Sequence, residues 1–137
     1  LPTEECWSLL AETEVGRLAV SITVHPDIFP VNYVVHDEHV VFRTAEGTKL
    51  AAAVLGTAVA FEIDGYAPDA GQAWSVVVKG TAEEIETMDE MWEALDLPLF
   101  PWHATPKTHY VRIVPELVTG RRFRVADPDE AESAGLV

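Results

Sequence analysis

Basic residues are scarce in this 137-residue chain: 9 Lys and Arg stand against 23 Asp and Glu, which gives a formal net charge of −14. Binding to a phosphate backbone depends on many cationic contacts, so this balance excludes a general nucleic-acid-binding protein. The same scarcity excludes attraction to an anionic membrane surface through a polybasic patch.

Cysteine and long apolar runs are also lacking. The single Cys6 excludes an intramolecular disulfide and a cysteine-rich zinc or iron–sulfur site, which fits a reducing cytoplasm. No apolar run approaches the roughly 20 residues that a membrane-spanning helix needs. We therefore expect a cytoplasmic protein without a membrane partner.

The rest of the composition is typical of a folded globular chain, with 48% hydrophobic and 23% charged residues. The length suits one hydrophobic core. We expect one domain over residues 1–125, followed at residues 126–137 by an acidic C-terminal tail that contains no base.

Alternating apolar and polar residues predict that most of the domain is β-strand. Residues 17–24 alternate cleanly, with Val24 on the apolar side, and residues 31–35 and 40–44 predict a hairpin that turns at Asp37 and Glu38. Further strands are expected at residues 58–63, 74–79 (with a continuation past Gly80) and 109–114. The loop between the first two of these contains Gly65, Pro68 and Gly71.

Short helices are expected between some of these strands. Thr3 is expected to cap the first, Thr48 is expected to cap a second that ends at Gly56, and a third carries Met88 to Leu95 and ends before Pro98. Because strands and helices do not alternate regularly, the pattern predicts a mainly β fold: a six-stranded antiparallel sheet closed into a small barrel, with short flanking helices.

Residues 42–50 (FRTAEGTKL) combine the features of an anion site. Arg43 ends a strand, Gly47 makes a turn, and Thr48 and Lys49 begin a helix. The N–H groups of a first helical turn lack intrahelical partners and favour a phosphate, to which both bases would add charge-assisted bonds. On a chain this negative, an anionic ligand needs such a local reversal of sign. The alternative is that Thr48 only caps the helix and the two bases pair with surface acids.

The order of several motifs adds a resemblance to a known family. The motifs are FPVNYVV at 29–35, FRT at 42–44, GTKL at 47–50 and WSVVVKG at 74–80, flanked by segments 5–19 and 110–123. Together they resemble the pyridoxamine 5′-phosphate oxidase-like, FMN-binding split-barrel superfamily, in its nitroimidazole-resistance-like subgroup. The resemblance implies a split β-barrel homodimer with one FMN in each of two clefts at the subunit interface.

The same resemblance implies three groups of flavin contacts. Those to the FMN phosphate are Arg43, Thr44, Thr48 and Lys49. Those to the edge of the isoalloxazine ring, through backbone groups, are Val31, Asn32 and Tyr33. Those to the ribityl chain or ring are Trp74 and Ser75, with Trp102 or Arg121 contributed by the second subunit.

The substrate side departs from the pyridoxamine 5′-phosphate oxidases themselves. Residues 83–96 carry seven acidic residues and no base, so a doubly charged phosphate ester would be repelled there. We therefore expect an FMN-dependent oxidoreductase that passes electrons from a reduced nucleotide to a small organic acceptor other than pyridoxamine phosphate. The cofactor carries the redox chemistry in such enzymes, so no catalytic side chain is assigned.

Several alternatives stay open. A deazaflavin-dependent reductase of the same fold would need residues 121–124 along the path of its oligoglutamate chain, and a haem-handling relative would need a ligand at the iron. A flavin carrier without turnover would use the same cofactor site, and a barrel without ligand would serve only as an interaction module. The five histidines lack the spacing of a zinc site, so no metal is expected.

Overall fold

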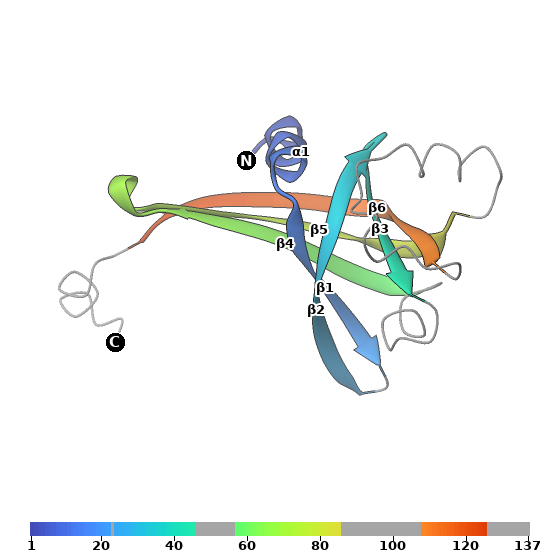
Figure 1. Cartoon of the computed structure of the whole chain (residues 1–137). Helices are drawn as coiled ribbons and strands as arrows, with labels where there is room; N and C mark the ends of the chain where they lie inside the picture. The colour runs from blue at the N-terminus through green and yellow to red at the C-terminus, as the bar shows by residue number, and fades with distance from the viewer. Residues whose placement is uncertain (23, 46–56, 86–107, 126–137) are drawn as a thin grey trace.

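The computed structural model describes residues 1–22, 24–45, 57–85 and 108–125 (Figure 1). One helix precedes six strands and a single short 3₁₀ turn in these ranges. The elements are α1 (Thr3–Glu12), β1 (Val15–Ile22), β2 (His25–His36), β3 (His39–Ala45), β4 (Ala58–Ala67), η1 (Pro68–Ala70), β5 (Gln72–Glu84) and β6 (Thr108–Arg124).

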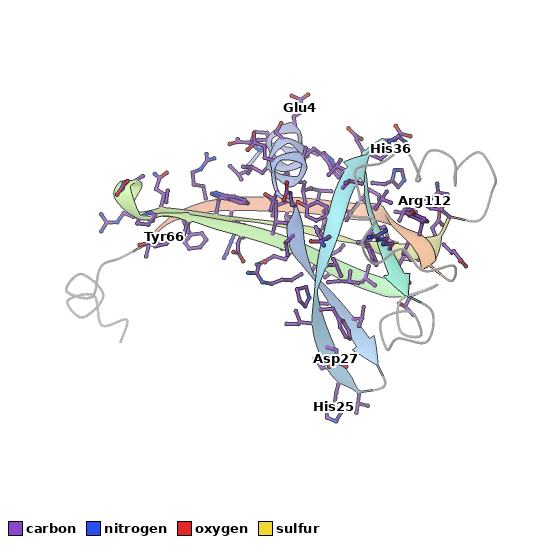
Figure 2. All side chains as sticks on the ribbon, viewed as in Figure 1. Glu4, His25, Asp27, His36, Tyr66 and Arg112 are labelled. Atoms are coloured by element: carbon purple, nitrogen blue, oxygen red, sulfur yellow. The ribbon has the colours of Figure 1, made fainter. Side chains whose placement is uncertain are left out.

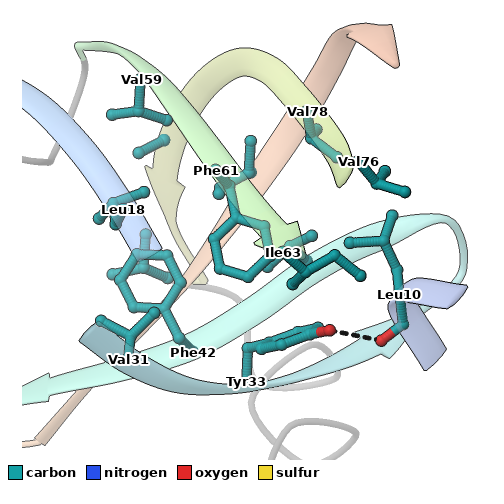
Figure 3. Packing of buried hydrophobic residues seen from close by; sticks show 14 of the residues in the cluster. Leu10, Leu18, Val31, Tyr33, Phe42, Val59, Phe61, Ile63, Val76 and Val78 are labelled. Carbon is teal, nitrogen blue, oxygen red and sulfur yellow. Dashed lines mark hydrogen bonds between the residues drawn. The ribbon is translucent and has the colours of Figure 1, made fainter. Parts of the chain in front are cut away.

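The six strands form a closed antiparallel barrel in the order β1-β2-β3-β6-β5-β4, which confirms the predicted fold class. Alternate residues of every strand point inward and form one core, whose members include Phe42, Phe61 and Ile63, each 0% exposed (Figure 3). Because side chains alternate along a strand, the residues between them face outward and are free to form sites.

Two of the ladders are shorter than their strands. β2 and β3 pair only from His36 opposite His39 to Tyr33 opposite Phe42, although β2 begins at His25 and β3 continues to Ala45. β1 and β4 pair over three positions, from Arg17 to Ala19 on β1. The β1–β2 hairpin therefore points away from the long β4, β5 and β6 strands (Figure 1), and the barrel is split beside it.

The hairpin predicted around Asp37 and Glu38 is confirmed. Both residues have positive φ, 51° and 55°, as a two-residue type I′ turn requires. The continuation of β5 past Gly80 is also confirmed.

Other boundaries differ from the prediction. β2 begins six residues before its predicted start, because two prolines interrupt the apolar pattern in that part of the strand. β6 runs ten residues past its predicted end. Gly65 lies within β4, not in a loop, and Val24 follows β1 and is 84% exposed. The expected cap Thr3 is the first helical residue, because Pro2 is the N-cap.

Some predicted elements lie outside the described residues. These are the helices expected after Thr48 and around Met88, and the acidic tail at residues 126–137. Within the described residues, no helix is long and apolar enough to cross a membrane.

Helix α1 packs against the barrel through Cys6 and Leu10, which are both 0% exposed. The hydroxyl of Tyr33 donates a hydrogen bond of 2.5 Å to the carbonyl oxygen of Leu10 (Figure 3). Gly120 of β6 leaves room for the helix, since a Cβ there would lie 2.6 Å from the Cys6 sulfur. These contacts fix the helix to one end of the core.

Candidate functional site

The candidate site lies where β2 and β3 separate. Pro26 and Pro30 both lie at even-numbered positions of β2, so their backbone groups face the same side of the strand. A proline is tolerated in a strand where its missing N–H faces an unpaired edge. The backbone groups of the odd-numbered β2 positions face β1, as the hydrogen bond of 3.1 Å from Tyr33 N–H to Glu14 O shows, and those of the even-numbered positions face away from β1. Asn32 shares the parity of the prolines, so its backbone N–H and C=O face the gap between β2 and β3.

Arg43 lies just beyond the last pair of the β2–β3 ladder. Its neighbours Phe42 and Thr44 are buried in the barrel, so the Arg43 side chain is on the outer face, where it is half-buried. No hydrogen bond or ion pair from any described residue reaches its guanidinium. A half-buried cation without a carboxylate partner among the described residues is unusual on a chain of net charge −14, and it is available to an anionic ligand.

An apolar wall stands beside Arg43. Tyr110 of β6 is the register partner of Arg43. With Val34 it packs against a small outer cluster of Val41 and Ile85, which are 2% and 7% exposed. Sequence reasoning missed this wall. The strand alternation at 109–114 could have placed Tyr110 on the outer face, but nothing local reveals that it lies opposite Arg43.

The structure describes only one of the other three predicted phosphate contacts. The Thr44 side chain is on the inner face of β3 and only 5% exposed, so of the described pair Arg43 and Thr44 only Arg43 is presented outward. Thr48 and Lys49 lie outside the described residues. All four assignments stay predictions.

The ring-edge residues were predicted to act through their backbones, and their positions are compatible with this. Val31 and Tyr33 are 8% and 3% exposed, with side chains in the core, so only their backbones can meet a ligand outside. Burial raises the pKa of Tyr33 to about 12, opposed by a side-chain hydrogen bond with Thr13. Asn32 is exposed.

A second group of predicted residues lies elsewhere in the fold. Ser75 and Arg121 are register partners on β5 and β6, and the Arg121 guanidinium lies 5.8 Å from the centroid of the Phe123 ring. Trp74 packs partly against the core, so it is turned to the opposite face from Ser75. Trp102 lies outside the described residues.

The two groups of residues are far apart within one chain. Arg121 follows Tyr110, the partner of Arg43, by eleven positions on β6, or roughly 36 Å at about 3.3 Å per residue. Figure 2 shows the same separation, with Tyr66 at the end of the long strands and Arg112 at the far side of the barrel. One chain therefore brings Asn32, Arg43 and Tyr110 together, but not Ser75 and Arg121 with them.

Comparisons with known proteins find matches that extend over most of the chain. A family model described as pyridoxamine 5′-phosphate oxidase matches residues 2–122. The solved structure of an FAD binding protein from Mycobacterium smegmatis has a TM-score of 0.86 and 44% sequence identity, covering 92% of this chain and 98% of that one. Two uncharacterized proteins of Mycobacterium tuberculosis are also similar. Rv3129 is 45% identical over 95 residues, which are 69% of this chain and 84% of Rv3129. Rv0080 is 37% identical over 132 residues, which are 93% of this chain and 86% of Rv0080.

Proposed function

Because the chain belongs to the pyridoxamine 5′-phosphate oxidase family, we propose that it binds a flavin at the gap between β2 and β3. The observation that carries the proposal is the half-buried Arg43 guanidinium without a described partner, beside an open backbone edge. The M. smegmatis relative, 44% identical, is described as an FAD binding protein. The finer proposal is FMN, with its phosphate at Arg43.

The described residues fit the parts of such a cofactor. The Arg43 guanidinium offers the forked donors that suit a phosphate. The backbone N–H and C=O of Asn32 offer one donor and one acceptor, which suit the alternating acceptors and donor of a flavin's pyrimidine edge. Tyr110 and the cluster around Val41 exclude water on one side. A bound flavin would supply hydride and single-electron chemistry.

A second copy of the chain would complete the site. Ser75 and Arg121 are roughly 36 Å from the Arg43 region, so they can reach the same flavin only from another subunit. The end of the long strands that carries them also exposes Tyr66 and Phe123, which are 59% and 46% exposed. We therefore place the homodimer contact there, with Arg121 of one copy facing Arg43 of the other.

The proposed activity is oxidoreduction. Electrons would pass from a reduced nicotinamide nucleotide to a small organic acceptor other than pyridoxamine phosphate. The argument against that substrate is the acidic segment at residues 83–96, which has seven acidic residues and no base and would repel a doubly charged phosphate ester.

Purification followed by absorption spectroscopy and mass measurement of the bound small molecule tests the cofactor. FMN or FAD supports the proposal, while the mass of a deazaflavin supports a deazaflavin-dependent reductase of the same fold instead. A colourless protein that does not bind added FMN contradicts both. Anaerobic addition of NADH or NADPH then tests the activity: bleaching of the bound flavin supports an oxidoreductase, and a flavin that no donor reduces indicates a carrier.

A further inference from the structure

A groove with a volume of about 450 Å³ opens on the outside of the barrel, away from Arg43. It lies where β1 separates from β4, and its surface is mostly apolar. Small side chains such as Ala19, Ala58 and Ala60 line it, together with Val20 and Val59. A volume of this size is within the range of small-molecule sites.

Backbone polar groups border the groove because the β1–β4 ladder ends early. The last pair is Ala19 opposite Ala60. Ser21 and Ala58 are the next positions that would pair, since Ser21 lies opposite Pro26 on β2 and its backbone must face the β4 side. Among the strands that the structure describes, their N–H and C=O groups have no partner on the β1–β4 side, and they are available to a ligand.

Two opposite charges complete the lining. Lys79 is exposed, and its ammonium makes no hydrogen bond or ion pair in the part of the chain that the structure describes. Glu116 is the extra residue of a β-bulge, where Lys79 pairs with Leu117 but Gly80 pairs with Pro115. Bulges redirect side chains and occur beside binding sites. The Glu116 carboxylate accepts a hydrogen bond of 3.2 Å from the Thr81 hydroxyl, which holds it in place.

The bulge is fixed by the backbone as well. A Cβ at Gly80 would lie 2.0 Å from the carbonyl oxygen of Val114. Only glycine therefore lets β6 approach closely enough to present Glu116 to the groove. Within the described residues, Lys79 and Glu116 form no ion pair with each other, so both charges are available to a third group.

We propose that this groove binds a free α-amino acid with an apolar side chain. The carboxylate would pair with the Lys79 ammonium, the α-ammonium with the Glu116 carboxylate, and the side chain would lie on the alanine floor. This zwitterion matches the two charges and the apolar floor at once. A simple carboxylate or a simple amine would leave one of the two charges without a partner.

A second copy of the chain is the competing occupant of the groove. An interface there would bury Lys79 and Glu116 between copies, and each pair of charges would then need partners from the other copy. The test below separates the two cases. Leucine binding at the groove does not depend on flavin binding. The proposed function can therefore fail while the groove proposal holds, and the groove proposal can fail while the proposed function holds.

The experiment is an NMR titration of the ¹⁵N-labelled full chain with L-leucine, 4-methylpentanoate and 3-methylbutylamine. Saturable shifts at Ala19, Ala60 and Lys79 are expected with leucine, and at least about tenfold weaker binding with either singly charged analogue. Lys79→Met and Glu116→Gln should each weaken leucine binding to a similar degree, and Ala60→Phe should abolish it. Glu4→Gln and Ala67→Phe, both at exposed positions elsewhere, should leave it unchanged.

Thermal melts establish that each variant is folded before it is titrated, and Lys79→Met and Glu116→Gln change only exposed side chains. The proposal is overturned if leucine causes no saturable shift at the groove, or if the analogues bind as well as leucine. It is equally overturned if leucine does not bind and Ala60→Arg converts a dimer to a monomer, because a second copy then covers the groove.

Discussion

The hydroxyl of Tyr33, on β2, donates a hydrogen bond of 2.5 Å to the carbonyl oxygen of Leu10, in α1. Both residues are almost fully buried, at 3% and 0% exposed. The bond therefore fixes the helix to the barrel in a place that water does not reach.

Tyr33→Phe should lower the free energy of unfolding by about 1–2 kcal/mol, because it removes the hydroxyl donor to the buried Leu10 carbonyl and leaves only the 3.4 Å hydrogen bond from the Thr13 backbone N–H. The pH dependence should change as well. Burial raises the pKa of Tyr33 to about 12 in the folded state, against about 10 in the unfolded chain. The unfolded chain thus releases this proton first, and the wild type loses stability as the pH rises from 10 to 12. Urea unfolding across that range should show a smaller loss in Tyr33→Phe. An equal loss in both proteins would contradict the assignment.

The ring of Trp74 covers Gly65, its register partner on β4. A Cβ at position 65 would lie 2.5 Å from two atoms of the indole ring. Gly65→Ala should therefore displace the ring and cost about 1–3 kcal/mol of stability, measured by urea unfolding. In a Trp74→Leu background the same substitution should cost much less, and an undiminished cost there would show that the ring is not the cause.

The turn between β2 and β3 holds Glu38 at a φ of 55°, a conformation that glycine adopts without strain. Glu38→Gly should raise the stability by about 0.4–1 kcal/mol, since Asp-Gly is a preferred type I′ sequence. Glu38→Ala is the matched control, because it removes the same charge but keeps the Cβ. Thermal melts of the two variants decide the question, and a gain in both would implicate the charge.

Much of the fold could be predicted from local alternation, and the misses have local causes. β1 alternates cleanly, and β3 and the middle of β5 are short apolar runs rich in valine, which also favour strands, whereas Pro26 and Pro30 interrupt the pattern of β2. Both prolines are tolerated because they face an unpaired edge. The length of β6 was hidden by Pro115 and Gly120, whose positions make sense only beside Gly80 and Cys6.

The candidate site was predictable only in part for the same reason. Arg43 could be found because it lies near the end of a predicted strand, beside other anion-binding residue types. Its neighbour Tyr110 could not, because contacts between β3 and β6 depend on a pairing of distant segments. The pairing of Ser75 with Arg121 likewise depends on the bulge at Glu116, which shifts the register of every later pair.

If the proposed site is right, Arg43→Ala should weaken flavin binding at least about tenfold while the barrel stays folded, because it removes the proposed charge-assisted bonds to the phosphate. Arg17→Ala is the control: Arg17 is also on the outer face but is paired with Glu62 at 3.3 Å and Asp64 at 3.1 Å. Fluorescence titration with FMN measures both affinities, and circular dichroism reports the fold. Unchanged affinity in Arg43→Ala would remove this residue from the site.

Mixed dimers test whether Arg43 and Arg121 serve one flavin from different subunits. In the proposed homodimer, the Arg43→Ala and Arg121→Ala variants each have a lesion in both sites, so both should bind FMN weakly. When the two variants are unfolded and refolded together, half of the dimers are mixed, and each mixed dimer contains one site without a lesion and one with both. About a quarter of all sites should then recover wild-type affinity, as expected for two-fold symmetric dimers. Titration with FMN would show this as a tight fraction that neither variant has alone. If no tight fraction forms, although tagged subunits prove that mixed dimers are present, the two arginines do not meet at one site.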